Sequence, residues 1–117
     1  MILTTIPPID SKRYFENVIK KVADGSMVLK FLNHDIQNIC RHQELYILII
    51  SKCAIKNNCI LLDIRQNFLW DTNYLSKFCD DGIHPNQQGQ TDIANYVVSQ
   101  FRNIEINKKL FCGNIKM

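Results

Sequence analysis

The chain has 117 residues, which is enough for one small domain and too few for two. Hydrophobic residues make up 46% of it and charged residues 21%, a composition typical of soluble globular proteins. The net charge is only +3, and basic residues lie in scattered pairs such as Lys12–Arg13 rather than in a stripe, so nucleic acid is not an expected partner.

The first predicted elements are a strand and a helix. The stretch Ile2–Ile6 is short, rich in β-branched residues and closed by two prolines, which is typical of a buried strand that ends in a loop. Asp10 or Ser11 can then cap a helix, because apolar residues recur after them at helical spacing. Asp24–Gly25 breaks this helix, and the apolar piece at 27–32 is predicted to form a helical turn.

A long helix and a second strand follow. Apolar residues recur at three- and four-residue steps from Asp35, a candidate N-cap, to Asn57–Asn58, which predicts a helix of about six turns. Its centre is apolar on more than one face, so we expect it to be well buried. Cys59–Ile64 is a continuous apolar run with one Asp near its end, which is typical of a strand covered on both faces. Segment 65–78 is a connection with some helical character.

The order strand, helix, helix, strand, helix indicates an α/β fold with a parallel sheet. The helices between residues 12 and 57 can form the crossover that two parallel strands require. Only two strands are predicted, and two are too few for a stable open α/β sheet. The predicted sheet is therefore incomplete by itself.

The stretch CDDGIHPNQQGQTDIANYVV, residues 79–98, leads from a turn into the closing helix. Pro85 keeps the backbone of His84 extended, and Gly82 can adopt a positive φ, so the chain can turn sharply between Asp81 and His84. Asn86 is a good N-cap for the helix that follows. The turn thus fixes an imidazole outside a helix start, with a carboxylate folded back beside it.

Asp81 and His84 are the candidate catalytic residues. A carboxylate that accepts a hydrogen bond from the Nδ1–H group of an imidazole sets its tautomer and leaves Nε2 free as a base, which is two-thirds of a Ser-His-Asp site. Spacing alone favours the alternative, in which both are ordinary turn and cap residues of a solvated loop, since short motifs often occur without function.

The block DGIHPNQQG resembles the last conserved block of the SGNH hydrolases, also called GDSL esterases or lipases: Asp-x-x-His-Pro-Asn followed by a Gly. The segments ILTTIPPID and NNCILLDIRQNFL resemble the fourth and fifth strands of that fold, in the same order. The resemblance covers residues 1–102. It implies that His84 is a general base, that Asp81 orients it, and that neither a metal nor an organic cofactor takes part.

The same resemblance implies the C-terminal portion of a flavodoxin-like three-layer α/β/α fold, and an ester or other acyl bond as the substrate of the intact parent. In that family the nucleophilic Ser lies in a Gly-Asp-Ser block after the first strand, and the oxyanion-hole donors follow the first three strands. We therefore expect this chain to be a truncated hydrolase that is inactive alone, because acyl transfer has no nucleophile without that block.

Other residues could be mistaken for site residues. Asp24–Gly25–Ser26 has the right residue types in the wrong order and between helices, so we interpret it as a helix stop followed by an N-cap. Gly113–Asn114 is predicted to be a turn. His34 and His42 are predicted to be cap, surface or packing residues, because neither has a carboxylate at a metal-site spacing.

Removal of the first three strands from such a fold leaves the edge of Ile2–Ile6 open. Open edges pair with other chains, so we expect a homodimer in which two of these strands pair antiparallel across a two-fold axis. The alternative is a non-catalytic α/β module that acts by self-association or by binding a partner. A nucleotide-binding domain is disfavoured, because no Gly-rich loop follows either strand. Residues 103–117 are a tail without an assigned structure.

The sequence also bears on location. The longest apolar run, Leu45–Ile50, is far shorter than the roughly 20 residues that span a bilayer. The N-terminus has no positively charged segment and meets Pro7 early, unlike a signal peptide. We therefore expect a cytoplasmic protein without a membrane span. The five cysteines lack C-x-x-C spacing and predict free thiols rather than a disulfide framework or a zinc site.

Overall fold

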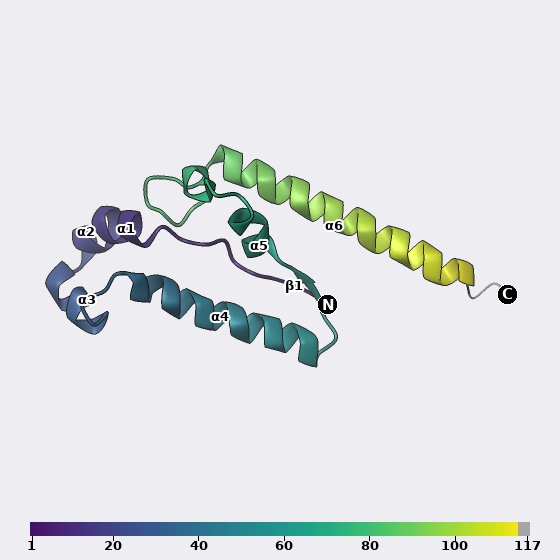
Figure 1. Cartoon of the computed structure of the whole chain (residues 1–117), viewed down its shortest axis with the longest axis horizontal. Helices are drawn as coiled ribbons and strands as arrows, with labels where there is room; N and C mark the ends of the chain where they lie inside the picture. Colours follow the sequence, from purple (N-terminus) through teal and green to yellow (C-terminus); the bar gives the residue numbers. More distant parts are fainter. Residues whose placement is uncertain (115–117) are drawn as a thin grey trace.

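The computed structural model describes the backbone of residues 1–114 and the side chains of residues 1–105. The fold is mixed α/β and mostly helical, and the described part of the chain holds two short parallel strands (Figure 1). Strand β1 (Ile2–Thr4) pairs with β2 (Ile60–Leu62), with Ile2 opposite Ile60. The predicted α/β class and the parallel pairing are confirmed, although both strands are shorter than the predicted segments.

Beyond the short backbone pairing of β1 with β2, hydrogen bonds of the Thr5 side chain connect the two segments. The N–H of Thr5 still donates to the carbonyl of Leu62 (3.1 Å), but the prolines at 7–8 have no N–H with which to continue. The hydroxyl of Thr5 donates to Oδ1 of Asp63 (2.9 Å) and accepts from the N–H of Arg65 (3.0 Å). These bonds hold the carboxyl ends of the two strands side by side.

The helical segment after β1 is α1 (Ser11–Tyr14), continued by a π-helical turn (Phe15–Ile19) and by α2 (Lys20–Val22). Of the two predicted caps, Asp10 is the N-cap, and its side chain accepts from the N–H of Arg13 (3.1 Å). Residues 5–9 connect the carboxyl end of β1 to this cap.

Helix α3 (Gly25–Phe31) follows a break at the predicted position. Our prediction that Ser26 is its N-cap is wrong. The N-cap is Asp24, whose Oδ1 accepts from the N–H groups of Ser26 (2.9 Å) and Met27 (3.3 Å). A carboxylate can accept from several N–H groups of a first turn, so the helix begins two residues earlier than a cap at Ser26 would require.

Helix α4 (Gln37–Lys56) is the predicted long helix, and it packs against both strands. Ala54, on its inner face, is 2% exposed. Our prediction that the whole helix is well buried is wrong, because Leu45 and Ile49 on the opposite face are 46% and 56% exposed. A sheet of two strands covers one face of a helix and leaves the other open, whatever its hydrophobicity.

The connection after β2 contains α5 (Ile64–Leu69) and a 3₁₀ turn (Tyr74–Lys77). In Figure 1 this connection and α6 (Gln87–Asn114) lie on one side of the strands and α4 lies on the other. The rings of Phe68 and Phe78 are buried with their centroids 5.3 Å apart. Their packing joins the start of the connection to its end.

Helix α6 continues beyond the predicted boundary at residue 102 as far as Asn114. The predicted turn at Gly113–Asn114 is therefore wrong for the backbone. Residues 103–112 contain no Gly or Pro, and a single Gly at position 113 costs a helix only about 1 kcal/mol. The rest of the predicted tail, residues 115–117, lies outside the described residues.

The hydrophobic core is small. Among the side chains that the structure describes, seven apolar ones are buried: Pro8, Phe15, Leu32, Ala54, Leu62, Phe68 and Phe78. The radius of gyration is 18.2 Å, whereas a compact domain of this length has a value of about 13 Å. The outward extension of α6 contributes to this difference (Figure 1). Much apolar surface thus remains available for contacts beyond the chain.

Candidate functional site

The loop 79–86 connects the 3₁₀ turn to α6 and carries both candidate catalytic residues. It closes on itself, because the N–H of Cys79 donates to the carbonyl of His84 (2.8 Å) and the N–H of Gly82 donates to the carbonyl of Cys79 (3.0 Å). Phe78 and Pro85 form an isolated antiparallel bridge at its base. The loop is therefore a closed turn with defined geometry rather than a loose connection.

Two glycines in this block are required by sterics. Gly82 has a φ of +74°, and a Cβ atom there would lie 2.7 Å from the carbonyl oxygen of Asp10. Gly89 lies in the first turn of α6, where a Cβ atom would lie 2.5 Å from the carbonyl oxygen of Lys77. Both obstacles are backbone atoms that cannot rotate away. The Gly residues of DGIHPNQQG therefore follow from close backbone approach on either side of His84.

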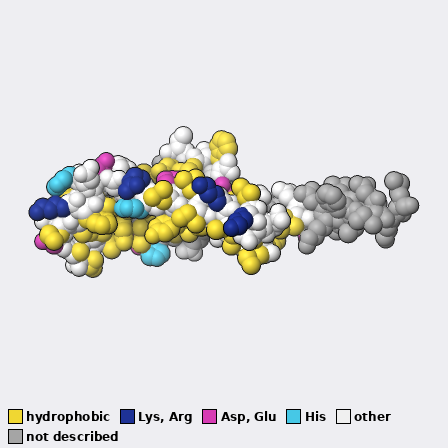
Figure 2. Space-filling view, turned by 90° about the horizontal axis from the view of Figure 1, so that it is seen from below, with side chains coloured by type: hydrophobic (Ala, Val, Ile, Leu, Met, Phe, Trp, Pro, Cys, Tyr) yellow, Lys and Arg dark blue, Asp and Glu magenta, His cyan; other side chains and the backbone are white. Residues whose placement is uncertain are grey.

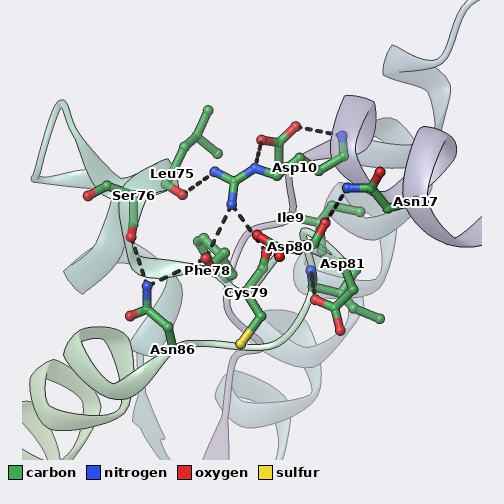
Figure 3. A network of polar contacts seen from close by, with 12 residues as sticks. Ile9, Asp10, Asn17, Leu75, Ser76, Phe78, Cys79, Asp80, Asp81 and Asn86 are labelled. Carbon is green, nitrogen blue, oxygen red and sulfur yellow. Dashed lines mark hydrogen bonds and ion pairs between the residues drawn. The ribbon is translucent and has the colours of Figure 1, made fainter.

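Helix α1 clamps the loop from the carboxyl side of β1 (Figure 3). The N–H of Asp10 donates to the carbonyl of Gly82 (2.8 Å). The guanidinium of Arg13 pairs with Oδ2 of Asp10 (2.7 Å) and donates to the carbonyls of Phe78 and Cys79 (3.2 Å each). Three backbone carbonyls of the loop region are thus held by groups at the start of α1.

Two further amides complete this support. Nδ2 of Asn17 donates to the carbonyl of Asp80 (2.6 Å), directly before Asp81. Asn86 is the predicted N-cap of α6, and its Oδ1 accepts from the N–H of Gly89 (3.1 Å). Its Nδ2 also donates to the carbonyl of Ser76 (2.8 Å). The loop is therefore fixed at both ends, by α1 on one side and by the start of α6 on the other.

Asp81 and His84 are brought together as the sequence predicts. Oδ2 of Asp81 lies 2.5 Å from Nδ1 of His84. Oδ1 of the same carboxylate accepts from the N–H groups of Ile83 and His84, each at 3.0 Å. The bond to Nδ1 is the orienting contact that a catalytic imidazole needs, since it fixes the ring and directs Nε2 away from the carboxylate.

Hydrogen bonds to the Asp81 carboxylate determine the protonation state of Asp81. The hydrogen bond from the His84 ring, followed by those from the N–H groups of His84 and Ile83, lowers the pKa of Asp81 to about 2. Asp81 is therefore ionised at neutral pH and accepts from Nδ1. The side chain of His84 is 73% exposed. Among the described residues, none is hydrogen-bonded to its Nε2 atom, so this nitrogen faces solvent.

Two open hollows lie beside the loop 79–86. One, of about 390 Å³, is lined by Asn17, Lys21, Asp80 and Asp81. The other, of about 520 Å³, is lined by Asn86, Gln87, Gln88 and Thr91 at the start of α6. Both are shallow and polar. His84 lines neither hollow, and neither is deep enough to enclose an acyl chain.

A nucleophile is the component that these residues do not supply to His84. All five serines of the chain are described, and each hydroxyl is hydrogen-bonded elsewhere: Ser11 to Cys40, Ser26 to Asp24, Ser51 to Ile47, Ser76 to Asn73 and Ser99 to Tyr96. Ser26 in particular belongs to the cap of α3, where its Oγ donates to Oδ1 of Asp24 (2.8 Å). None of the five is brought to the imidazole.

The other two histidines have local roles, in agreement with the sequence. His34 has a φ of +59° in the turn after α3, where its N–H donates to the carbonyl of Leu29 (2.7 Å). The ring of His42 stacks on that of Phe31, with centroids 6.2 Å apart. Within residues 1–105, no group of three or more His, Cys, Asp and Glu side chains is placed so that it could hold a metal ion.

Sequence reasoning missed Arg13 and Asn17, which position the loop without touching Nε2 of His84. A usable signal was present. Asp10, Arg13 and Asn17 recur at helical spacing on one face of the first helix, away from its apolar residues. A polar face that follows the carboxyl end of a strand in an α/β fold is a place to expect site-supporting residues.

Comparison with protein-family models, with curated proteins and with solved structures finds no match to this chain. The function must therefore be argued from the residues themselves. Any function has to be consistent with the bond between Asp81 and His84, with the exposed Nε2 atom, and with five serine hydroxyls that are all hydrogen-bonded elsewhere.

Proposed function

We propose that Asp81 and His84 are the orienting acid and the general base of an acyl-ester hydrolase of the SGNH type. The single observation that carries this proposal is the 2.5 Å contact between the Asp81 carboxylate and Nδ1 of His84. In this role Nε2 of His84 takes the proton from an attacking hydroxyl, and Asp81 stabilises the imidazolium. The same proton is then given to the leaving alcohol, which restores the neutral imidazole.

The nucleophile of this proposed site is a Ser hydroxyl other than the five in this chain. Moving Ser26 to the imidazole would require the cap of α3 to open, because its Oγ and the Asp24 carboxylate are hydrogen-bonded to each other. The chain alone is thus a half-site that holds a base and its orienting partner. The proposal does not specify the acid or the alcohol part of the ester, since the two hollows beside the loop 79–86 are shallow and polar.

The proposed fold is the C-terminal portion of a flavodoxin-like three-layer domain, completed by a second copy of the chain. Support comes from β1, which pairs with β2 alone in the described part of the chain. Its other edge can accept a further strand. Two β1 strands related by a two-fold axis would meet antiparallel and join two small sheets into one of four strands.

The second candidate is a non-catalytic α/β module that acts by self-association or by binding a partner. The observation that favours it is that every serine hydroxyl of the chain is engaged away from His84. In this case Asp81 and His84 are turn residues, and Asp81 serves chiefly to accept the N–H groups of Ile83 and His84.

The DNA upstream of the Met1 codon distinguishes the two candidates. A Gly-Asp-Ser segment there, in frame or frameshifted, supports the hydrolase, and a chain extended by that segment should hydrolyse p-nitrophenyl acetate. His84→Ala in the extended chain should abolish the hydrolysis, whereas the matched variant His42→Ala should leave it intact. If no such segment precedes the codon, or if the extended chain is folded and inert, the hydrolase proposal fails and the binding module stands.

A further inference from the structure

The outward face of α4 combines exposed apolar and basic side chains. Leu45 and Ile49 lie one turn apart, and Leu45 is directly opposite the buried Ala54 on the helix. Further side chains share this orientation at helical spacing. We define the α4 outer face by six residues: Arg41, His42, Leu45, Ile49, Lys52 and Lys56.

Helix α3 extends this face beyond the start of α4. The stacked rings of Phe31 and His42 join the two helices, and Phe31 itself is 79% exposed. Met27, one turn earlier in α3, is also exposed. Figure 2 looks onto this side of the molecule and shows hydrophobic side chains gathered along it, with Lys and Arg side chains and smaller acidic patches among them.

Completion of the sheet would not cover this face. The inner face of α4 already contacts β1 and β2. A strand added to the open edge of β1 lies in the plane of the sheet, and an element packed on it can reach a flank of α4. Leu45 and Ile49 point away from that plane, so they stay exposed in any enlarged sheet. A partner that contacts Leu45 and Ile49 must therefore approach from the side of α4 that faces away from the sheet.

The charge of the face selects that occupant. Arg41, Lys52 and Lys56 are cationic, and none of them forms an ion pair with a residue that the structure describes. The one acidic residue of α4, Glu44, is paired with Arg65 beside the strands. A second copy docked face to face about a two-fold axis would bring like charges together, so the occupant is anionic.

We propose that the α4 outer face, extended by Phe31 and Met27, docks on an anionic membrane surface. Along its helix the apolar residues Leu45 and Ile49 are flanked by Arg41 on one side and by Lys52 and Lys56 on the other, and this helix of 20 residues is about 30 Å long. An anionic lipid interface offers phosphate groups and acyl chains together over such a length, so Ile49 and Phe31 insert while Lys52 and Lys56 extend to the headgroups. No helix in the described residues could cross a membrane, so the helix lies along the surface. The proposal is independent of the hydrolase.

Vesicle sedimentation with the full chain tests this inference. The chain should pellet with vesicles of phosphatidylcholine and phosphatidylserine in equal parts, and much less with phosphatidylcholine alone. High salt should weaken the binding, because exposed charges are screened. Each Lys near an anionic leaflet strengthens partitioning about fivefold, so Lys52→Gln should lower it by about that factor. The matched variant Arg102→Gln, on α6, should change it far less.

The apolar part is tested by Ile49→Ser, which should lower partitioning without loss of helicity, and by its matched control Val98→Ser on α6. Val98 has a comparable exposed fraction, so a nonspecific apolar effect would weaken both variants equally. Failure of the folded chain to bind anionic vesicles would overturn the proposal. Equal loss of vesicle partitioning in the two Ser variants would also overturn it. So would a change in oligomeric state on Ile49→Ser, because the face would then bind a second copy of the chain.

Discussion

The N–H of Asp10 donates to the carbonyl of Gly82 across 2.8 Å, and this bond joins the start of α1 to the tip of the loop that carries Asp81 and His84. Asp10 follows β1, whereas Gly82 lies between β2 and α6. The bond therefore connects the segments that follow the two strands. It sets the loop at the carboxyl side of the sheet, which is where open α/β sheets place their sites.

The first prediction concerns Gly82. Replacement by Ala forces a positive φ on a residue with a Cβ atom and places that atom 2.7 Å from the Asp10 carbonyl oxygen. We expect Gly82→Ala to lower the free energy of unfolding by about 2–4 kcal/mol, as strained backbone and overpacking do together. Urea unfolding followed by circular dichroism measures it.

The control for Gly82 is Gly25→Ala. A Cβ atom at position 25 meets side-chain atoms only, the nearest 3.2 Å away in the flexible Lys20 and the next at an ordinary 3.6 Å in Phe15, and Ala favours a helical first turn. This variant should be neutral or slightly stabilising. Equal destabilisation by both substitutions would show that the loop is not held against α1 as described.

The sequence predicted those features of the site that depend on neighbouring residues. Pro85, Gly82 and Asn86 determine the loop through local sterics and capping, so the contact between Asp81 and His84 could be predicted from their order. The role of Arg13 could not, because its carbonyl partners Phe78 and Cys79 are brought to it only by the tertiary fold. Local propensity says nothing about contacts of that kind.

The same distinction explains the wrong prediction for α4. Its spacing identified a helix correctly, because periodicity is a local property. Burial depends on how much of the surroundings the chain supplies, and here two strands cover one face alone. Leu45 and Ile49 are as apolar as core residues, yet they are exposed. The hydrophobicity of these side chains shows that their burial would be favourable, but it does not show that the chain contains residues that pack against them.

The second prediction concerns Arg13. Its guanidinium donates to two loop carbonyls and pairs with Asp10, and a Lys cannot reproduce this fork of donors. We expect Arg13→Lys to destabilise the chain by about 1–3 kcal/mol and to speed hydrogen exchange at the N–H of Cys79. The exposed neighbour Lys12 provides the control, since Lys12→Gln should alter neither quantity. Unchanged exchange in Arg13→Lys would exclude the proposed clamp.

The third prediction concerns pH. The pKa of Asp81 is lowered to about 2 by the His84 ring and by two N–H groups. A depressed pKa in the folded state means that the ionised carboxylate stabilises the fold. This contribution is complete above the ordinary pKa of Asp, about 4, and is lost as the pH falls from there through about 2. Stability of the wild-type chain should therefore decline across this acidic range.

Carboxyl NMR titration checks the cause of that shift. His84→Ala removes its largest contribution, so the pKa of Asp81 should rise while staying below its ordinary value, because the backbone N–H groups at positions 83 and 84 remain. Asp24 is the internal control. Its pKa is also lowered, but by Ser26 and Met27, and should not respond to His84→Ala. An unchanged pKa of Asp81 in His84→Ala would show that the His84 ring does not hydrogen-bond to the Asp81 carboxylate.

The fourth prediction is that the chain alone has negligible activity on an activated ester such as p-nitrophenyl acetate. Proton removal by His84 has no hydroxyl to act on, because all five serines are engaged elsewhere. A residual rate should be the same in Ser26→Ala. A robust rate that Ser26→Ala abolishes would show that the cap of α3 opens and that Ser26 is the nucleophile after all.

The fifth prediction is that the chain forms a dimer through the open edge of β1. The small core leaves little apolar burial to offset the chain entropy of 117 residues. Light scattering at micromolar concentration should give twice the monomer mass, and the interface should bury about 2,000 Å² or more, as obligate dimers do.

One substitution can separate edge pairing from other modes of association. The N–H of Thr5 bonds to β2, so by the alternation of a strand the N–H of Thr4 points to the open edge. Thr4→Pro therefore removes a donor from that edge and spares the pairing with β2. We expect Thr4→Pro to be monomeric or unfolded and Thr4→Ser to remain dimeric. A wild-type monomer that melts cooperatively would show that the two-stranded fold is stable by itself, and a dimer that survives Thr4→Pro unaltered would place the interface elsewhere.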